Sequence, residues 1–242
     1  MTEVRPGGFQ ILPPVIKNLL IINVLVFAAK IVLYKANIIN LDYYFALFHW
    51  NSPLFKIWQP ITHIFMHGSF THLLFNMFAL WMFGSVIENT LGSKRFLIFY
   101  FICGLGAALC HLLVFNFENA SNIAWFTQLP KDEQIQAIIQ AIDTNKGDPR
   151  ILPMIIPMVG ASGAIFGLLF AFGYLFPNTL IYFYFLIPIR AKYFVALYAL
   201  LELGLGIGNN PGDNVAHFAH LGGMLFAFIL FRIWRIRSNK YA

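Results

Sequence analysis

A serine surrounded by small residues is the first candidate for chemistry in this chain. Ser162 lies in the stretch GASGAIFG, where a proline-containing segment passes into an apolar run. A hydroxyl in this setting can cap a helix or fill a tight contact between helices. With a base beside it, the same hydroxyl can attack a carbonyl carbon. The local residues leave all three roles open.

Two histidines near the end of the chain are candidate bases. The stretch NVAHFAHLGG places His217 and His220 three residues apart, and Gly223 follows. Small residues such as Gly223 and Gly163 let two membrane helices approach closely. Such a contact would bring His220 towards Ser162, and a hydroxyl beside an imidazole is the arrangement of an activated nucleophile.

Hydrogen-bond donors and one carboxylate occupy a third region. In HGSFTHLLFN, His72 and Asn76 are four residues apart and therefore share one face of a helix. Both side chains can donate to a single point, although hydrogen bonds between helices would use the same residue types. In GSVIENTLG, Glu88 is predicted to lie at the inner end of its helix. We expect this carboxylate to tie loop backbone or a neighbouring helix rather than to react.

The composition is that of a membrane protein. Of the 242 residues, 59% are hydrophobic and 11% are charged, whereas soluble domains have about 45–50% and about 25%. Mean hydropathy is +0.70. This polar surface is too small to coat a soluble particle, which favours an integral membrane protein. The net charge of +6 is spread along the chain, so we expect no nucleic-acid partner.

The apolar runs predict an all-α bundle that spans the membrane six times. The expected spans are residues 15–33, 71–89, 96–117, 162–176, 191–207 and 215–234. Ten of the 16 Lys and Arg residues fall on the side that holds both termini, which places the termini in the cytoplasm. The chain is thus predicted to be one membrane domain, 1–242, with a short cytoplasmic N-terminus (1–14) and a basic cytoplasmic tail (235–242).

The run that begins at Ser162 is unusually short. Its fifteen residues make a helix of about 22 Å, whereas the hydrocarbon core is about 30 Å thick. If the far end is anchored at the inner surface, Ser162 lies below the outer one. Non-helical backbone at that depth is tolerated only when it is buried in protein or lines a wet cavity.

A long connection, residues 118–157, is predicted to be an external loop with an amphipathic helix. In KDEQIQAIIQAID, isoleucines recur with helical spacing at Ile135, Ile138, Ile139 and Ile142. Such a helix can rest on the outer membrane surface. It can equally fold back as a loop helix without a function of its own.

Four motifs in order, HGSFTHLLFN, GSVIENTLG, GASG and AHLGG, resemble the rhomboid family of intramembrane serine proteases. The resemblance covers about residues 58–234 and is to a bacterial-type six-span core. It implies a dyad in which Ser162 is the nucleophile and His220 the general base. It also implies an oxyanion hole formed by His72, Asn76 and the Ser162 backbone N–H. The remaining residues implied to support the site are Phe166, which would stack on the imidazole, Gly160, Gly163, Gly223, Glu88 and Trp58.

The resemblance also implies a function. The chain would cleave transmembrane or juxtamembrane segments of single-pass membrane proteins, without metal or cofactor. Its expected location is the cell membrane, with the active site open to the external side. Two features qualify the match. Gln59 follows Trp58 where the family often has arginine. Glu202 or Asp213 could in principle complete a triad with His220, although the resemblance implies a dyad.

Two other readings remain. A metal-binding membrane protein could use the pair His63 and His67 or the pair His217 and His220, although we expect no carboxylate or cysteine to complete either site. A catalytically inactive rhomboid-like protein would only bind membrane helices. The presence of both the serine and the histidine of the dyad argues against that reading.

Overall fold

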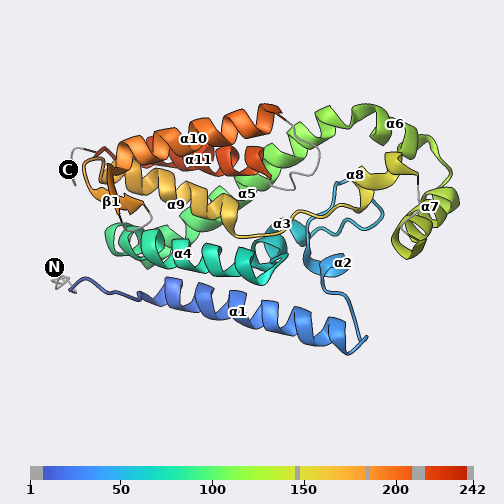
Figure 1. The fold of residues 1–242 in the computed structure, drawn as a ribbon, viewed down its shortest axis with the longest axis horizontal. Helices are drawn as coiled ribbons and strands as arrows, with labels where there is room; N and C mark the ends of the chain where they lie inside the picture. The colour runs from blue at the N-terminus through green and yellow to red at the C-terminus, as the bar shows by residue number, and fades with distance from the viewer. Residues whose placement is uncertain (1–7, 145–147, 184–185, 209–215, 239–242) are drawn as a thin grey trace.

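The apolar runs fold into a bundle of helices. The computed structural model describes residues 8–144, 148–183, 186–208 and 216–238 (Figure 1). Within these residues, four helices are long and apolar enough to cross a membrane: α1 (Pro14–Lys35), α4 (Phe70–Leu91), α5 (Ser93–Glu118) and α10 (Ala191–Gly208). Two shorter apolar helices, α9 (Ser162–Leu175) and α11 (His217–Ile233), complete the bundle. Each of the six predicted spans coincides with one of them, so the chain is a multi-pass membrane protein.

Helix α9 is the centre of the bundle. It packs against α4, α5, α10 and α11, and eleven of its fourteen residues are buried. A helix that is apolar all round belongs in the interior. It begins at Ser162, is about 21 Å long with its fourteen residues, and lies among the other helices of the bundle (Figure 1).

Glycines bring α9 and α11 into direct backbone contact. A Cβ atom added at Gly223 of α11 would overlap the carbonyl oxygen of Gly163 in α9. A Cβ atom at Gly167 would lie 2.7 Å from Cys103 Cβ of α5 and 3.1 Å from the Gly223 carbonyl oxygen. The small-residue contact predicted from sequence is therefore present, and no larger side chain fits within it.

Glu88, near the C-terminal end of α4, joins three helices. It is 2% exposed, and its carboxylate accepts hydrogen bonds from the backbone N–H groups of Val15 (3.0 Å) and Ile16 (2.9 Å). The Ser93 hydroxyl donates to the same carboxylate at 2.6 Å. An acceptor is needed here because the first N–H groups of a helix have no partner within it.

We expect Glu88→Ala to lower the free energy of unfolding by about 3 kcal/mol, because buried N–H donors at the start of α1 would lose a charged acceptor. An SDS titration in mixed micelles would measure the change. The control is Glu118→Ala at the exposed end of α5, which should stay within about 0.5 kcal/mol. Equal stability of the two variants would contradict the role given to Glu88.

The connection between α1 and α4 is ordered around Gln59. It contains α2 (Asp42–Phe45), α3 (Gln59–Thr62) and the 3-10 turn η1 (His63–Phe65). Gln59 is fully buried; its amide oxygen accepts from Phe48 N and Lys56 N, and its amide nitrogen donates to Leu54 O at 3.0 Å. Gln59 thus supplies the hydrogen bonds that hold this loop, at the position where rhomboid proteases often have an arginine.

The connection between α5 and α9 forms a separate lobe. It consists of α6 (Ala120–Gln128), α7 (Lys131–Thr144), η2 (Pro149–Ile151) and α8 (Leu152–Ile155), at the right of Figure 1. The predicted amphipathic helix is α7. Its apolar stripe divides: Ile138 is buried in the core of the lobe, while Ile135 and Ile139 are exposed.

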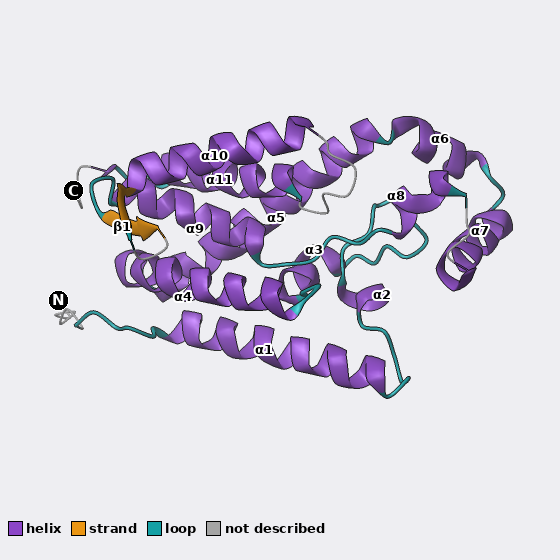
Figure 2. Cartoon of the chain, viewed as in Figure 1, coloured by secondary structure: helices purple, strands orange, loops and turns teal. Residues whose placement is uncertain are grey.

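One element departs from the all-helical prediction. Strands β1 (Leu180–Phe183) and β2 (Ile187–Arg190) pair antiparallel, with Leu180 opposite Arg190 (Figure 2). They connect α9 to α10. Figure 1 also shows that α1 begins and α11 ends at the same end of the bundle as this hairpin, away from the α6–α8 lobe.

Candidate active site

The segment before Ser162 carries non-helical backbone into the bundle. Met158 pairs with Leu47 through two backbone hydrogen bonds of 2.9 and 2.8 Å. Gly160 N donates to His63 O at 3.0 Å. These bonds satisfy backbone groups that lipid could not satisfy. Ser162 then begins α9 and is half-buried.

Ser162 and His220 lie within hydrogen-bond reach. His220, in the first turn of α11, has Nε2 3.0 Å from Ser162 Oγ. The backbone contact between Gly163 and Gly223 sets this separation, since both glycines lie within one turn of the two side chains. The hydroxyl and the imidazole are therefore held together by helix packing.

Two aromatic rings support the imidazole from one side. Phe166 stacks on His220 with centroids 4.0 Å apart and planes 4° apart. Tyr198 of α10 stacks in turn on Phe166, with ring centroids 5.2 Å apart and planes 16° apart. Sequence reasoning named Phe166 through the resemblance but missed Tyr198, which no local motif marks.

A carboxylate contacts the other nitrogen of the imidazole. Glu202 Oε2 lies 2.9 Å from His220 Nδ1 and 2.6 Å from His217 Nδ1, and Glu202 is 4% exposed. Of the two acids that could complete a triad with His220, Glu202 is thus the one that contacts its imidazole. The signal was present in the sequence, because an acid inside an apolar membrane helix is costly. The other candidate acid, Asp213, lies outside the described residues.

The same three residues are a possible metal site. Ligand atoms of Glu202, His217 and His220 all lie within 4.8 Å of one another. This corrects the expectation that no carboxylate completes the His217–His220 pair. One carboxylate oxygen and two imidazole nitrogens are donors that suit zinc. The pair His63 and His67 belongs to no such group within the described residues.

Two donors from α4 converge beside Gly160. A Cβ atom added there would lie 2.9 Å from His72 Nε2 and 3.7 Å from Asn76 Nδ2. Gly160 has φ +123°, a conformation that favours glycine. Asn76 is 7% exposed, and its Nδ2 atom has no hydrogen-bond partner among the described residues. The turn before Ser162 thus faces the imidazole of His72 and the side-chain amide of Asn76.

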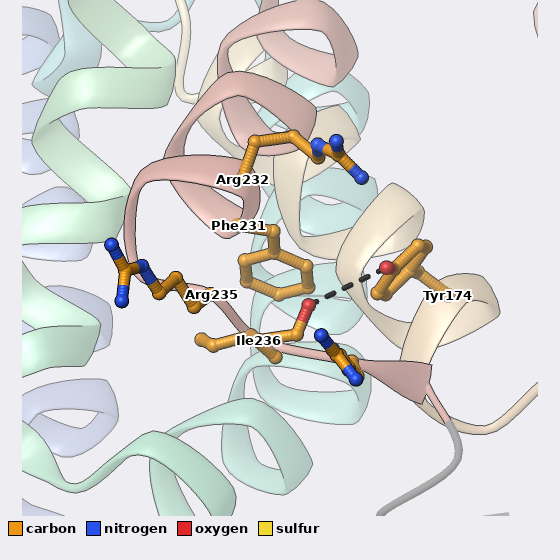
Figure 3. A pocket seen from close by; sticks show the side chains of 6 residues that line it. Tyr174, Phe231, Arg232, Arg235 and Ile236 are labelled. Carbon is orange, nitrogen blue, oxygen red and sulfur yellow. Dashed lines mark hydrogen bonds between the residues drawn. The ribbon is translucent and has the colours of Figure 1, made fainter.

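A cavity of about 280 Å³ lies at the other end of α11. Figure 3 shows Tyr174 donating to the Ile236 carbonyl at 3.4 Å beside Phe231, with Arg232 and Arg235 around them. The seventeen residues of α11 place this cavity about 25 Å from His217. It is separate from the serine and histidine.

Sequence comparison places this bundle in a known class. A family model, the Rhomboid domain, matches residues 54–236. The chain belongs to the rhomboid family. The matched region includes Ser162, His220, both α4 donors and Glu202.

Rhomboid relatives come from bacteria and from mitochondria. The putative rhomboid protease YdcA of Bacillus subtilis is 30% identical over 174 residues, which are 71% of this chain and 66% of YdcA. The rhomboid protease GluP of the same organism is 30% identical over 171 residues, 70% of this chain and 25% of GluP. The mitochondrial rhomboid protein 1 of Saccharomyces cerevisiae is 28% identical over 165 residues, 68% of this chain and 38% of that protein. The chain thus spans less than two thirds of the length of these relatives.

Proposed function

We propose that this rhomboid is an intramembrane serine endopeptidase that cuts transmembrane or juxtamembrane segments of single-pass membrane proteins. The 3.0 Å separation of Ser162 Oγ and His220 Nε2, inside a bundle of apolar helices, carries the proposal. Family membership and the relatives named as proteases support it.

The proposed chemistry uses one proton carrier. His220 Nε2 accepts the Ser162 hydroxyl proton while Oγ bonds to the substrate carbonyl carbon. As the carbon–nitrogen bond breaks, His220 returns that proton to the leaving amine. Water then attacks the acyl-serine through the same base, which releases the acid and restores the hydroxyl.

The developing oxyanion needs donors aimed at it. His72 and Asn76 lie beside Gly160. Ser162 follows two residues later, and its backbone N–H has no partner within α9 because Ser162 begins the helix. In a water-poor site such donors stabilise the tetrahedral intermediate more strongly than they would in water. The Asn76 Nδ2 atom has no hydrogen-bond partner among the residues that the structure describes, which fits this role.

We expect Asn76→Ala to lower kcat by about 10²–10³-fold and to leave KM nearly unchanged, because the lost hydrogen bond forms in the transition state. Steady-state cleavage of a single-span substrate would measure both constants. The control is Asn23→Ala, a fully buried asparagine of α1 whose Nδ2 donates to Leu19 O. If both variants lose activity equally, Asn76 acts through folding.

The proposed orientation places both termini in the cytoplasm. The excess of Lys and Arg on that side supports it, as does the common end of the bundle at which α1 begins and α11 ends. The Ser162 end of α9 would then open to the external side of the cell membrane. Segments 1–14 and 235–242 would be cytoplasmic, and 118–157 external.

Cleavage by the purified chain tests the proposed function. Several single-span substrates with small residues at the cut and a destabilised helix nearby would be reconstituted with the chain or with Ser162→Ala. We expect cleavage only with the unmutated chain, and fluorophosphonate labelling that Ser162→Ala abolishes. The absence of both would indicate a rhomboid that only binds membrane helices. Cleavage that survives Ser162→Ala and stops with a chelator would indicate metal chemistry at Glu202, His217 and His220.

A further inference from the structure

We propose that Glu202 is a positioning residue for the reaction, so that the site is a triad of Ser162, His220 and Glu202. This inference rests on the proposed function. Its basis is the 2.9 Å contact between Glu202 Oε2 and His220 Nδ1, on the side of the ring opposite Ser162.

The burial of Glu202 needs an explanation. Only three described residues of α10 are buried, namely Ala191, Val195 and Glu202, and much of the helix surface is exposed leucine. A carboxylate inside a membrane bundle is costly unless hydrogen bonds compensate it. Among the described residues, the hydrogen bonds to the Glu202 carboxylate come from the imidazoles of His217 and His220.

The contact selects one form of the histidine ring. An ionised carboxylate only accepts hydrogen bonds, so His220 Nδ1 must carry the hydrogen in this contact. The neutral ring then keeps its lone pair on Nε2, which faces the Ser162 hydroxyl. This is the form that a general base requires. When Nε2 gains the serine proton, the resulting cation lies beside a negative charge, while Glu202 itself takes no proton.

His217 holds the carboxylate in place. Its Nδ1 lies 2.6 Å from the same oxygen, Glu202 Oε2, that contacts His220. The two rings are nearly perpendicular, at 89°, with centroids 6.5 Å apart. One oxygen thus accepts from two directions, which limits the rotation of the carboxylate. His217 is therefore a second positioning residue that acts through Glu202.

Helix α10 supports the imidazole of His220 in two ways. It places a carboxylate at the edge of the ring and an aromatic ring behind Phe166. Glu202 lies one turn after Tyr198, on the same face of the helix. Tyr198 backs Phe166, which stacks on His220. Packing alone could hold the plane of the ring, but it cannot choose which nitrogen carries the hydrogen. The carboxylate supplies that choice.

The test is Glu202→Gln in the full chain. We expect kcat to fall by about 10²–10⁴-fold with KM unchanged, because the amide can donate to Nδ1 and favour hydrogen on Nε2. The rate of fluorophosphonate labelling of Ser162 should fall with it. Glu202→Asp should recover part of both rates. Glu118→Gln makes the same chemical change at an exposed position and should alter neither.

A second readout separates positioning from folding. Nitrogen NMR of the chain labelled at histidine should show His220 with hydrogen on Nδ1, and with hydrogen on Nε2 in Glu202→Gln. If Glu202→Gln does not fold, His217→Asn tests the same chain of contacts. This variant should lower kcat, but by less than the fall of about 10²–10⁴-fold expected for Glu202→Gln. Wild-type kcat in Glu202→Gln, or lost activity with an unchanged ring form, would overturn the inference. The proposed function would still stand, since its own tests are cleavage and fluorophosphonate labelling by the unmutated chain and the loss of both in Ser162→Ala.

Discussion

His220→Ala is expected to lower kcat by roughly 10⁴–10⁶-fold, and Ser162→Ala by a similar factor. Either change removes the transfer of the hydroxyl proton, so the second change has nothing further to remove. The double variant should therefore be no slower than the slower single variant. KM should change little, because neither side chain is asked to bind the ground state.

Single-turnover cleavage of a single-span substrate in proteoliposomes would measure these rates. Ser85→Ala is the matched control: Ser85 is a buried serine of α4 whose hydroxyl donates to Ile11 O at 3.1 Å. It should cleave at the unmutated rate. Losses that multiply in the double variant would mean that Ser162 and His220 act independently, which contradicts a shared proton.

The contact between Ser162 and His220 could be predicted from the sequence. Each residue is followed within three positions by glycine, in GASG and in AHLGG. Small residues on two apolar helices predict a close crossing, and the side chains beside the crossing then meet. The helices themselves were equally accessible, because long apolar runs in a membrane have few other structures open to them.

The contact between Glu202 and His220 could not be predicted from the sequence. Residues 191–208 are apolar on every face except at Lys192 and Glu202, so no periodicity says which side of α10 faces the bundle. That choice depends on how Val195, Tyr198 and Glu202 pack against neighbours that are distant in sequence. The charge alone marked the residue as costly, but its partner came from the fold.

Short elements were not predicted from the sequence, for a related reason. The hairpin of β1 and β2 consists of two four-residue strands in an apolar stretch, too short for a period of two to differ from a helical pattern. For α7 the sequence predicted the apolar stripe but not its partner. Ile138 packs within the lobe while Ile135 remains exposed, a division that only the folded connection decides.

Gly223→Val is expected to lower the free energy of unfolding by about 3–5 kcal/mol and also to slow cleavage. The new Cβ would overlap the Gly163 carbonyl oxygen, and backbone on both sides cannot yield as a flexible side chain would. Overpacking of a tight core typically costs about 1–3 kcal/mol, and two further methyl groups add to it. Because α9 and α11 must separate, Ser162 Oγ and His220 Nε2 move apart, and a misplacement of about 1 Å can cost about 10²-fold in rate.

Gly204→Ala separates this effect from the loss of a glycine as such. Gly204 lies within α10, and a Cβ atom added there would have no described atom within 4 Å. Alanine is the better helix former by about 1 kcal/mol, so this variant should be as stable as the unmutated chain or slightly more so, with unchanged cleavage. Thermal unfolding and kcat would be measured for both variants. If Gly223→Val unfolds at the same temperature as Gly204→Ala and cleaves as fast, the backbone contact of α9 and α11 does not set the distance between hydroxyl and imidazole.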